Sequence, residues 1–243
     1  MKIVTDLSVT SAPHRARHGW HPGWLFRSGA QGAWFDPSDV TTLFQDVAGT
    51  VPVMADGDPV ALMLDKSGNA NHATQPTAAA RPTWRTGGQL AWLEFDGVDD
   101  RMVIAGATFP HSALTVCAGM RYVAGGNAWG SVRSLTSTGI YAGLSNPTQA
   151  GTISNTGGQT FVNRALAPND RIALRNLLLS PKVVTVRDAQ ASAFSGHPWQ
   201  FVSYWNIAPP PARLFAYVEV NAATYQNLPF LERWVAVKTG VTL

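Results

Sequence analysis

The fold class is decided by the stretch Leu90-Ala91-Trp92-Leu93-Glu94-Phe95-Asp96-Gly97-Val98-Asp99-Asp100-Arg101-Met102-Val103-Ile104. Two apolar runs, at residues 90–95 and 101–104, flank five residues that are rich in Asp and Gly. Asp and Gly favour turns, because the Asp side chain bonds to nearby backbone N–H groups and Gly adopts positive φ. The stretch therefore predicts a strand, a tight turn and a second strand.

Similar short apolar runs recur from Ala33 to about Val220, separated by clusters of Gly, Asn, Asp, Pro and Ser. The helical stretches that a parallel sheet would need between its strands are missing. We therefore expect an all-β sandwich of two packed antiparallel sheets, spanning about Trp34 to Val220. Further strands are predicted at Leu114–Tyr122, Ile172–Leu179, Val183–Arg187, Phe201–Ile207 and Leu214–Val220.

Two short helices are predicted beside the strands. Asp36 is a suitable N-cap with Pro37 at the first helical position, so we expect a helix over residues 36–44. Near the C-terminus, the apolar residues of Leu228–Lys238 recur at spacings of three and four. Lys238 suits the negative end of that helix, and Gly240 is expected to terminate it.

The composition fits one such domain and excludes several classes of protein. Hydrophobic residues make up 45% and charged residues 14% of the 243 residues, which excludes a disordered chain. The single cysteine, Cys117, excludes an intrachain disulfide and is most simply a small core residue. The net charge is +3, but its excess lies mostly in residues 1–33, so the body offers no basic face for nucleic acid. We also expect no secretory signal and no membrane span, because no apolar run is long enough.

The first 32 residues form a separate segment of the sequence, which we call the N-terminal arm. It has no regular hydrophobic period, and it is rich in Pro, Gly, Arg and Trp. Trp and Arg are enriched at binding hot spots, so we expect the arm to dock onto a neighbouring subunit. A disordered terminus is the alternative. The expected anchors are Arg15, Arg17, Trp20, Trp24 and Arg27.

Enzymatic activity has no positive support in the sequence. The three glutamates, Glu94, Glu219 and Glu232, are widely separated, whereas sandwich glycosidases usually place two carboxylates on one strand. Glu94 and Asp96 are the closest pair of carboxylates, and the simpler interpretation is an exposed strand residue beside an aspartate of the turn. Nucleophile-elbow and zinc-protease motifs are both absent from the sequence. We therefore expect a protein that is not an enzyme.

One loop offers oxygen atoms at alternate positions, from Asp65, Ser67, Asn69 and Asn71. Such a pattern could surround a calcium ion. Asp, Asn, Ser and Gly clusters also form ordinary turns through bonds to their own backbone, and we favour the turn. The turn at residues 96–100 presents the same two alternatives.

Aromatic side chains on loops could stack on sugar rings, with polar neighbours bonding to the hydroxyl groups. The alternative for each aromatic residue is a place in the core or at a sheet edge. The candidates for carbohydrate binding are Trp84 with Arg85, Trp129 beside Asn127, and Trp199.

Several strings of residues resemble bacteriophage and prophage virion proteins. They are Gly32–Asp39, Leu43–Asp46, Asp56–Val60, Asp65–Gln75, Ala80–Pro82, Leu93–Asp100 and Glu232–Val241. Ala70 stands where these loops usually have Gly, which weakens the case for a left-handed residue there. The resemblance implies a concanavalin A-like, or laminin-G-like, jelly-roll sandwich at residues 33–243, and it brings no catalytic motif.

The resemblance also implies a function. We expect a virion structural protein, displayed as a fibre, spike or tail module that binds host surface polysaccharide and is made in the host cytoplasm. The alternative is an architectural subunit of the tail tip, baseplate or capsid that binds only other virion proteins. The expected partners are other virion proteins through the arm, and further copies of the chain, as in a trimer. No cofactor is expected, and calcium is the one metal left open.

Overall fold

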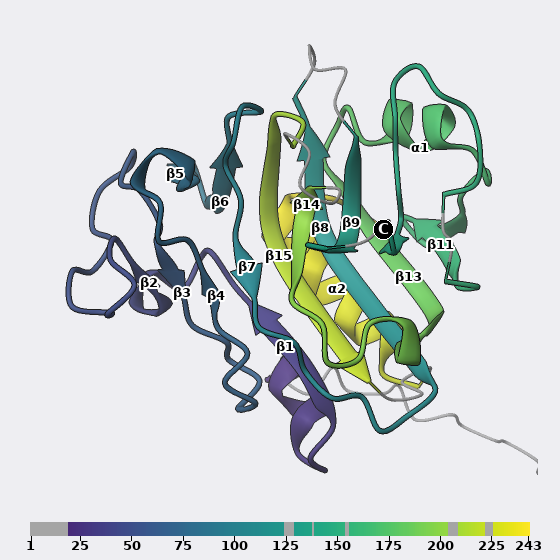
Figure 1. Ribbon diagram of the computed structural model, residues 1–243, viewed down its shortest axis with the longest axis horizontal. Helices are drawn as coiled ribbons and strands as arrows, with labels where there is room; N and C mark the ends of the chain where they lie inside the picture. Colours follow the sequence, from purple (N-terminus) through teal and green to yellow (C-terminus); the bar gives the residue numbers. More distant parts are fainter. Residues whose placement is uncertain (1–18, 124–128, 138, 154–155, 204–208, 222–225) are drawn as a thin grey trace, which may run out of the picture.

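Two antiparallel β-sheets pack face to face in the computed structural model, which describes residues 19–123, 129–137, 139–153, 156–203, 209–221 and 226–243 (Figure 1). The predicted two-sheet sandwich is thereby confirmed. The eight-stranded sheet has the order β12-β11-β13-β8-β15-β6-β5, and β1 also pairs with β15. The seven-stranded sheet has the order β10-β9-β14-β7-β4-β3-β2.

The strands differ greatly in length, and the longest form the centre of the eight-stranded sheet. That sheet consists of β1 (Gln31–Phe35), β5 (Thr83–Gly87), β6 (Leu90–Phe95), β8 (Ala113–Tyr122), β11 (Gln159–Val162), β12 (Ala165–Leu166), β13 (Lys182–Gln190) and β15 (Ala212–Asn221). The other consists of β2 (Leu43–Phe44), β3 (Leu62–Met63), β4 (Ala73–Thr74), β7 (Val103–Ile104), β9 (Gly130–Leu135), β10 (Tyr141–Ala142) and β14 (Trp199–Ser203). The helices are η1 (Pro22–Phe26), η2 (Val40–Thr42), η3 (Ala78–Ala80), α1 (Arg171–Leu177), η4 (Ala191–Ala193) and α2 (Leu228–Thr239).

The predicted strand–turn–strand at residues 90–104 is present, and it connects the two sheets. β6 belongs to the eight-stranded sheet and β7 to the seven-stranded sheet, so the turn at residues 96–100 crosses the edge of the sandwich. Leu93 and Phe95 point into the core between the sheets, as do Met102 and Ile104 after the turn. The Asp-Gly turn therefore closes one end of the sandwich.

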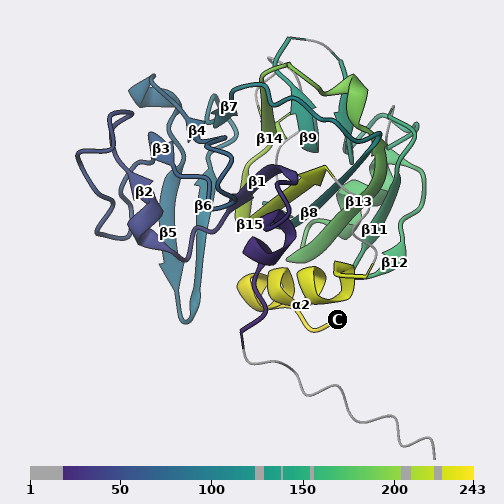
Figure 2. The ribbon, with the colours of Figure 1, turned by 90° about the horizontal axis from the view of Figure 1, so that it is seen from below.

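A second, smaller core lies on the outer face of the eight-stranded sheet, where α2 and η1 cover it (Figure 2). Apolar residues of β8, β13 and β15 on this face meet α2, so these strands are buried on both sides. Leu25 and Phe26 of η1 are 5% and 8% exposed in the same cluster. The members from the sheet and α2 are Trp34, Cys117, Val183, Ala216, Val218, Val220, Leu228, Leu231, Val235 and Ala236.

The C-terminal helix is confirmed, with Lys238 in its last turn and Gly240 at its C-cap in the left-handed conformation. Two other predictions are wrong. The segment at 36–44 forms only η2 and β2, because Leu43 pairs with Met63 in the seven-stranded sheet. The strand predicted at Ile172–Leu179 is α1, whose N-cap Asp170 accepts a hydrogen bond from the Ala173 N–H at 2.9 Å.

The predicted strands at Leu114–Tyr122, Val183–Arg187 and Leu214–Val220 lie within β8, β13 and β15. The strand predicted at Phe201–Ile207 starts earlier, as β14, and residues 204–208 lie outside the described residues. In the part of the chain that the structure describes, no helix combines the length and the apolar character needed to cross a bilayer.

Residues of the N-terminal arm belong to the folded body from η1 onward. Gln31 and Gly32 already lie in β1, where they pair with Asn221 and Val220. A Cβ atom at Gly32 would lie 2.0 Å from the Glu219 carbonyl oxygen, so this position of β1 requires glycine. The sandwich and its helical layer therefore take in part of the arm, while residues 1–18 lie outside the described residues.

Candidate functional site

The loop at residues 65–71 fastens β1 to the body. The Asp65 carboxylate accepts hydrogen bonds from the backbone N–H groups of Trp34 and Ser67, each at 2.8 Å, and from the Asn71 N–H at 3.0 Å. The Ser67 hydroxyl donates to the same carboxylate at 2.6 Å. The amide nitrogens of Asn69 and Asn71 donate to the Gly32 carbonyl oxygen, at 3.1 and 2.7 Å.

These bonds favour the turn over the calcium site for Asp65, Ser67, Asn69 and Asn71. Both oxygens of Asp65 already have two donors, and a cation would have to displace them. Ala70 has a φ of +59°, so the loop does place a left-handed residue at this position, although it is alanine and not glycine.

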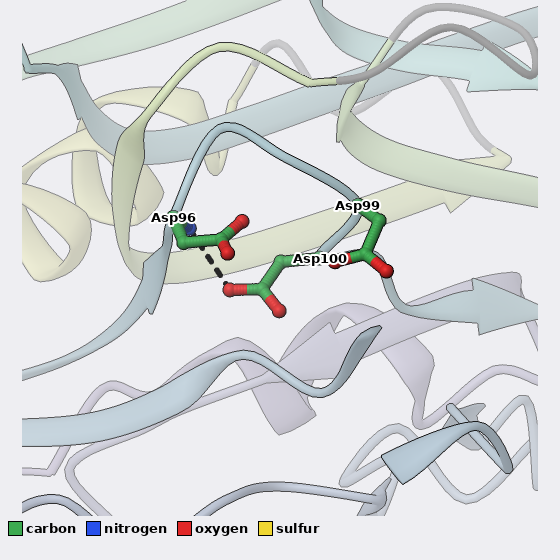
Figure 3. Close-up of side chains that lie close together, drawn as sticks. All are labelled: Asp96, Asp99 and Asp100. Atoms are coloured by element: carbon green, nitrogen blue, oxygen red, sulfur yellow. Dashed lines mark hydrogen bonds between the residues drawn. The ribbon is translucent and has the colours of Figure 1, made fainter. Parts of the chain in front are cut away.

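A second cluster of oxygen atoms lies at the turn between β6 and β7, where Asp96, Asp99 and Asp100 come together (Figure 3). Their ligand atoms lie within 4.8 Å of one another, the one such group of three or more acidic, His or Cys side chains among the described residues. The Asp96 N–H donates to the Asp100 carboxylate at 2.9 Å, and the Val98 N–H donates to Asp96 at 2.8 Å. We call residues 96–100 the acidic turn.

The three carboxyl groups of the acidic turn have different surroundings. Asp96 and Asp99 are exposed, whereas Asp100 is 4% exposed. The pKa of Asp100 is raised to about 7, chiefly by burial; the hydrogen bond from the Asp96 N–H opposes this rise, and the negative charges of Asp96 and Asp99 add to it. Three carboxylates suit a hard cation such as calcium, but Asp100 gives up its proton only near neutral pH.

The aromatic residues proposed for sugar binding do not gather at one place. Trp84 lies on β5 and donates its indole N–H to the Pro37 carbonyl oxygen at 2.9 Å. The Arg85 Nε atom forms an ion pair with the Asp56 carboxylate at 3.2 Å. The Trp129 ring lies 5.0 Å from the guanidinium of Arg171, next to β9. In Figure 2, β5 and β9 lie on opposite sides of the molecule.

Trp199 differs from the loop position that the sequence suggested. It lies on β14, is 1% exposed and packs against Phe201 and Tyr217 in the main core. A ring in this position is closed to a sugar. Asn127 lies outside the described residues.

The expected docking residues Trp20, Trp24 and Arg27 lie together at η1, whereas Arg15 and Arg17 lie outside the described residues. The Trp20 ring stacks on Phe230 of α2 with the ring centres 6.0 Å apart. Arg27 lies over the Trp24 ring at 4.6 Å.

Part of α2 continues this surface, and its residues were not among those predicted from the sequence. Phe230 is 46% and Val237 71% exposed, and Trp234 between them is half-buried. Their spacings of four and three place them on one side of the helix, a signal that the sequence contains. We call the surface of Trp20, Trp24, Arg27, Phe230, Arg233, Trp234 and Val237 the η1–α2 face.

Each glutamate is paired within the protein. Glu219 of β15 pairs with Arg133 of β9 between the sheets, and the Tyr217 hydroxyl donates to it at 2.9 Å. Glu232 of α2 is 2% exposed and pairs with Arg164 and Arg187, at 3.1 and 3.2 Å.

Glu94 accepts a hydrogen bond from the Trp92 indole at 2.9 Å and pairs with Arg213 at 3.4 Å. All three glutamates therefore serve the packing of the fold.

A groove of about 560 Å³ lies beside β12 and α1. Its lining is mostly apolar, with Leu166 and Leu177 exposed in it, and it contains no carboxylate, imidazole or hydroxyl side chain. Lys182 is the one ionisable side chain in its lining. Its residues are Val162, Asn163, Ala165, Leu166, Ala167, Pro168, Ala173, Asn176, Leu177 and Lys182.

Comparisons of the chain with models of protein families, with curated proteins and with solved structures find no match. The resemblance to virion proteins therefore depends on the strings of residues quoted above.

Proposed function

We propose that this chain is a structural protein of a bacteriophage virion and that it acts by binding other proteins of the particle. The support from the sequence is the resemblance of its strings to virion proteins. The structure adds that three of these strings contact one another. Asp36 of the first string pairs with Lys66 of the loop at 3.7 Å and with Lys238 of α2 at 3.0 Å. The resembling residues thus form a connected framework, which fits the concanavalin A-like jelly roll that they imply.

The observation that supports protein binding is the η1–α2 face. Large apolar side chains exposed together at a surface are typical of protein–protein interfaces, and Trp, Phe and Arg are enriched in interface cores. The arm enters the body at this face, because Trp20 stacks on Phe230. The first described residues of the arm therefore lie at this face, and we infer that the arm and this face attach the chain to the particle together.

Host polysaccharide binding stays a prediction, and it ranks behind protein binding. Its candidate aromatic residues lie apart, and Trp199 is in the core. A glycan array with the purified chain tests it directly. Specific binding that is lost on substitution of Trp84 or Trp129 would reverse this order.

The test of particle attachment is a truncation. Deletion of residues 1–28 would remove Leu25 and Phe26 from the second core, so it would confuse misfolding with lost attachment. Deletion of residues 1–18 leaves the whole described body, and we expect a folded protein that joins particles at less than a tenth of normal occupancy. Arg85→Ala, an exposed change on β5, is the control and should leave incorporation intact. Normal occupancy of the truncated protein would refute attachment through the arm.

A further inference from the structure

The outer side of α2 keeps exposed apolar side chains, although Trp20 stacks on Phe230 and Trp34 contacts Trp234. Leu231, Val235 and Ala236 face the sheet and are buried, as expected for the inner side of an amphipathic helix. Phe230 and Val237 on the outer side are nevertheless 46% and 71% exposed. A surface helix normally places polar residues there, so this second apolar stripe indicates a partner.

The η1–α2 face has a positively charged rim. Arg27 and Arg233 are exposed and supply this charge, whereas Lys238, a quarter exposed beside Trp234, is paired with Asp36. The one acidic residue of η1 and α2 is Glu232, which is buried and already paired with two arginines. A partner surface that is apolar and surrounded by carboxylates would complement this face.

The acidic turn has this character. Val98 at its tip is 68% exposed, and the exposed carboxylates of Asp96 and Asp99 stand on either side of it. Its apolar tip could contact the apolar side chains of the η1–α2 face, and its carboxylates could pair with the arginines there.

The acidic turn and η1 lie at opposite ends of the long strand β15, and α2 lies on the outer face of the sheet. Phe95, just before the turn, pairs with Ala212 at the start of β15, whereas Gln31, after η1, pairs with Asn221 at its end. At about 3.3 Å per residue, the ten residues of β15 separate the two ends by about 30 Å. One molecule therefore cannot join its own two surfaces, but two molecules can.

We propose that a second copy of this chain is the partner, and that the acidic turn of one copy docks on the η1–α2 face of the next. Such a head-to-tail contact uses two different surfaces, so it closes into a ring or continues as a filament. A pairing of two η1–α2 faces would instead bring their arginines together, which disfavours it. The inference depends on the proposed function, since it describes how copies assemble in the particle.

The test is sedimentation velocity of the full chain between about 5 and 200 μM, at about 50 mM and 500 mM NaCl. We expect association that grows with concentration and weakens at least tenfold in high salt, because the contact includes exposed charges. Arg233→Glu and Asp99→Lys should each yield monomers with unchanged melting temperature. Lys182→Glu changes the net charge as Arg233→Glu does, but at the β12–α1 groove, and should associate like the parent chain.

A mixing experiment identifies the head-to-tail geometry. The Arg233→Glu chain keeps its acidic turn and the Asp99→Lys chain keeps its η1–α2 face, so an equimolar mixture should form dimers and nothing larger. A monomeric parent chain at every concentration would overturn the proposal. So would association that survives Asp99→Lys, or a monomer that binds anionic phospholipid vesicles through Arg233.

The two proposals fail separately. A monomeric chain that still needs residues 1–18 to join particles overturns the self-association and leaves the proposed function standing. A chain that associates with itself but never joins particles overturns the proposed function and leaves the self-association standing.

Discussion

Replacing Asp100 by asparagine should remove one source of pH dependence from the stability of this protein. The pKa of Asp100 is raised from 3.8 to about 7, first because burial penalises its charged form. Below about pH 4 the folded and unfolded states both hold the proton. Between about pH 4 and 7 only the folded state holds it, so the free energy of unfolding falls as the pH rises through this window.

The size of the effect follows from the shift. A difference of about three pKa units corresponds to at most about 4 kcal/mol, at about 1.4 kcal/mol per unit. Water at the exposed neighbours Asp96 and Asp99 screens the buried charge, so we expect about 2 kcal/mol. Asparagine keeps the shape of the side chain, and its oxygen can still accept the hydrogen bond from the Asp96 N–H.

The assay is urea unfolding followed by tryptophan fluorescence at about pH 5 and pH 8, in about 0.5 M NaCl to suppress self-association. Asp100→Asn should be about 2 kcal/mol more stable than the parent chain at pH 8, and the difference should fall to less than about 1 kcal/mol at pH 5, nearer the start of the window. Asp99→Asn is the control. It should keep most of the parent's pH dependence, because burial has more effect on Asp100 than its neighbours' charges do. If the parent chain and Asp100→Asn lost the same free energy of unfolding between pH 5 and pH 8, the reasoning would be refuted.

Three further predictions concern single positions. Ala70→Gly should stabilise the protein by about 1 kcal/mol in urea unfolding, since the φ of +59° is unfavourable for alanine, and Ala78→Gly in η3 should destabilise it instead. Burial raises the pKa of the Cys117 thiol to about 12, so iodoacetamide at pH 8 should leave the folded protein unmodified and alkylate it in urea; modification without urea would contradict this burial. Calcium at about 5 mM and EDTA should give the same melting temperature, because the Asp65 oxygens are fully engaged. A calcium-dependent rise that Asp65→Asn abolishes would restore the loop as a metal site, and a rise that Asp99→Asn abolishes would assign the metal to the acidic turn.

Local patterns in the sequence predicted the elements whose own residues determine them. α2 has its apolar spacing, its Pro at the start and its Gly240 at the end within one segment, and the prediction was correct to within a residue or two. The segment at 36–44 was wrongly predicted as a helix because Asp36 does not cap one. The carboxylate pairs with Lys66 and Lys238, far along the chain, and it bonds the Ser38 N–H in a local turn. No window of neighbouring residues contains that information.

The candidate sites depended still more on distant contacts. Trp199 follows His197 and Pro198 and has the surroundings of a loop residue, yet β14 carries it into the core. Trp20 and Phe230 are 210 positions apart and form one surface only after folding. The acidic turn was visible as a string, but the burial that separates Asp100 from Asp96 and Asp99 depends on packing between the two sheets.

The pairing of β1 with β15 has a consequence for how this protein acquires its structure. Gln31 and Asn221 are partners at a separation of 190 positions, and contacts at such separations make folding slow. At about 5–20 residues per second, a ribosome needs about 10–40 s to add the residues between them. During that interval β1 is exposed without its neighbour, and it is open to pairing with other nascent chains. A chain diluted from urea has both strands available at once, so refolding in the test tube and synthesis in the cell begin from different states.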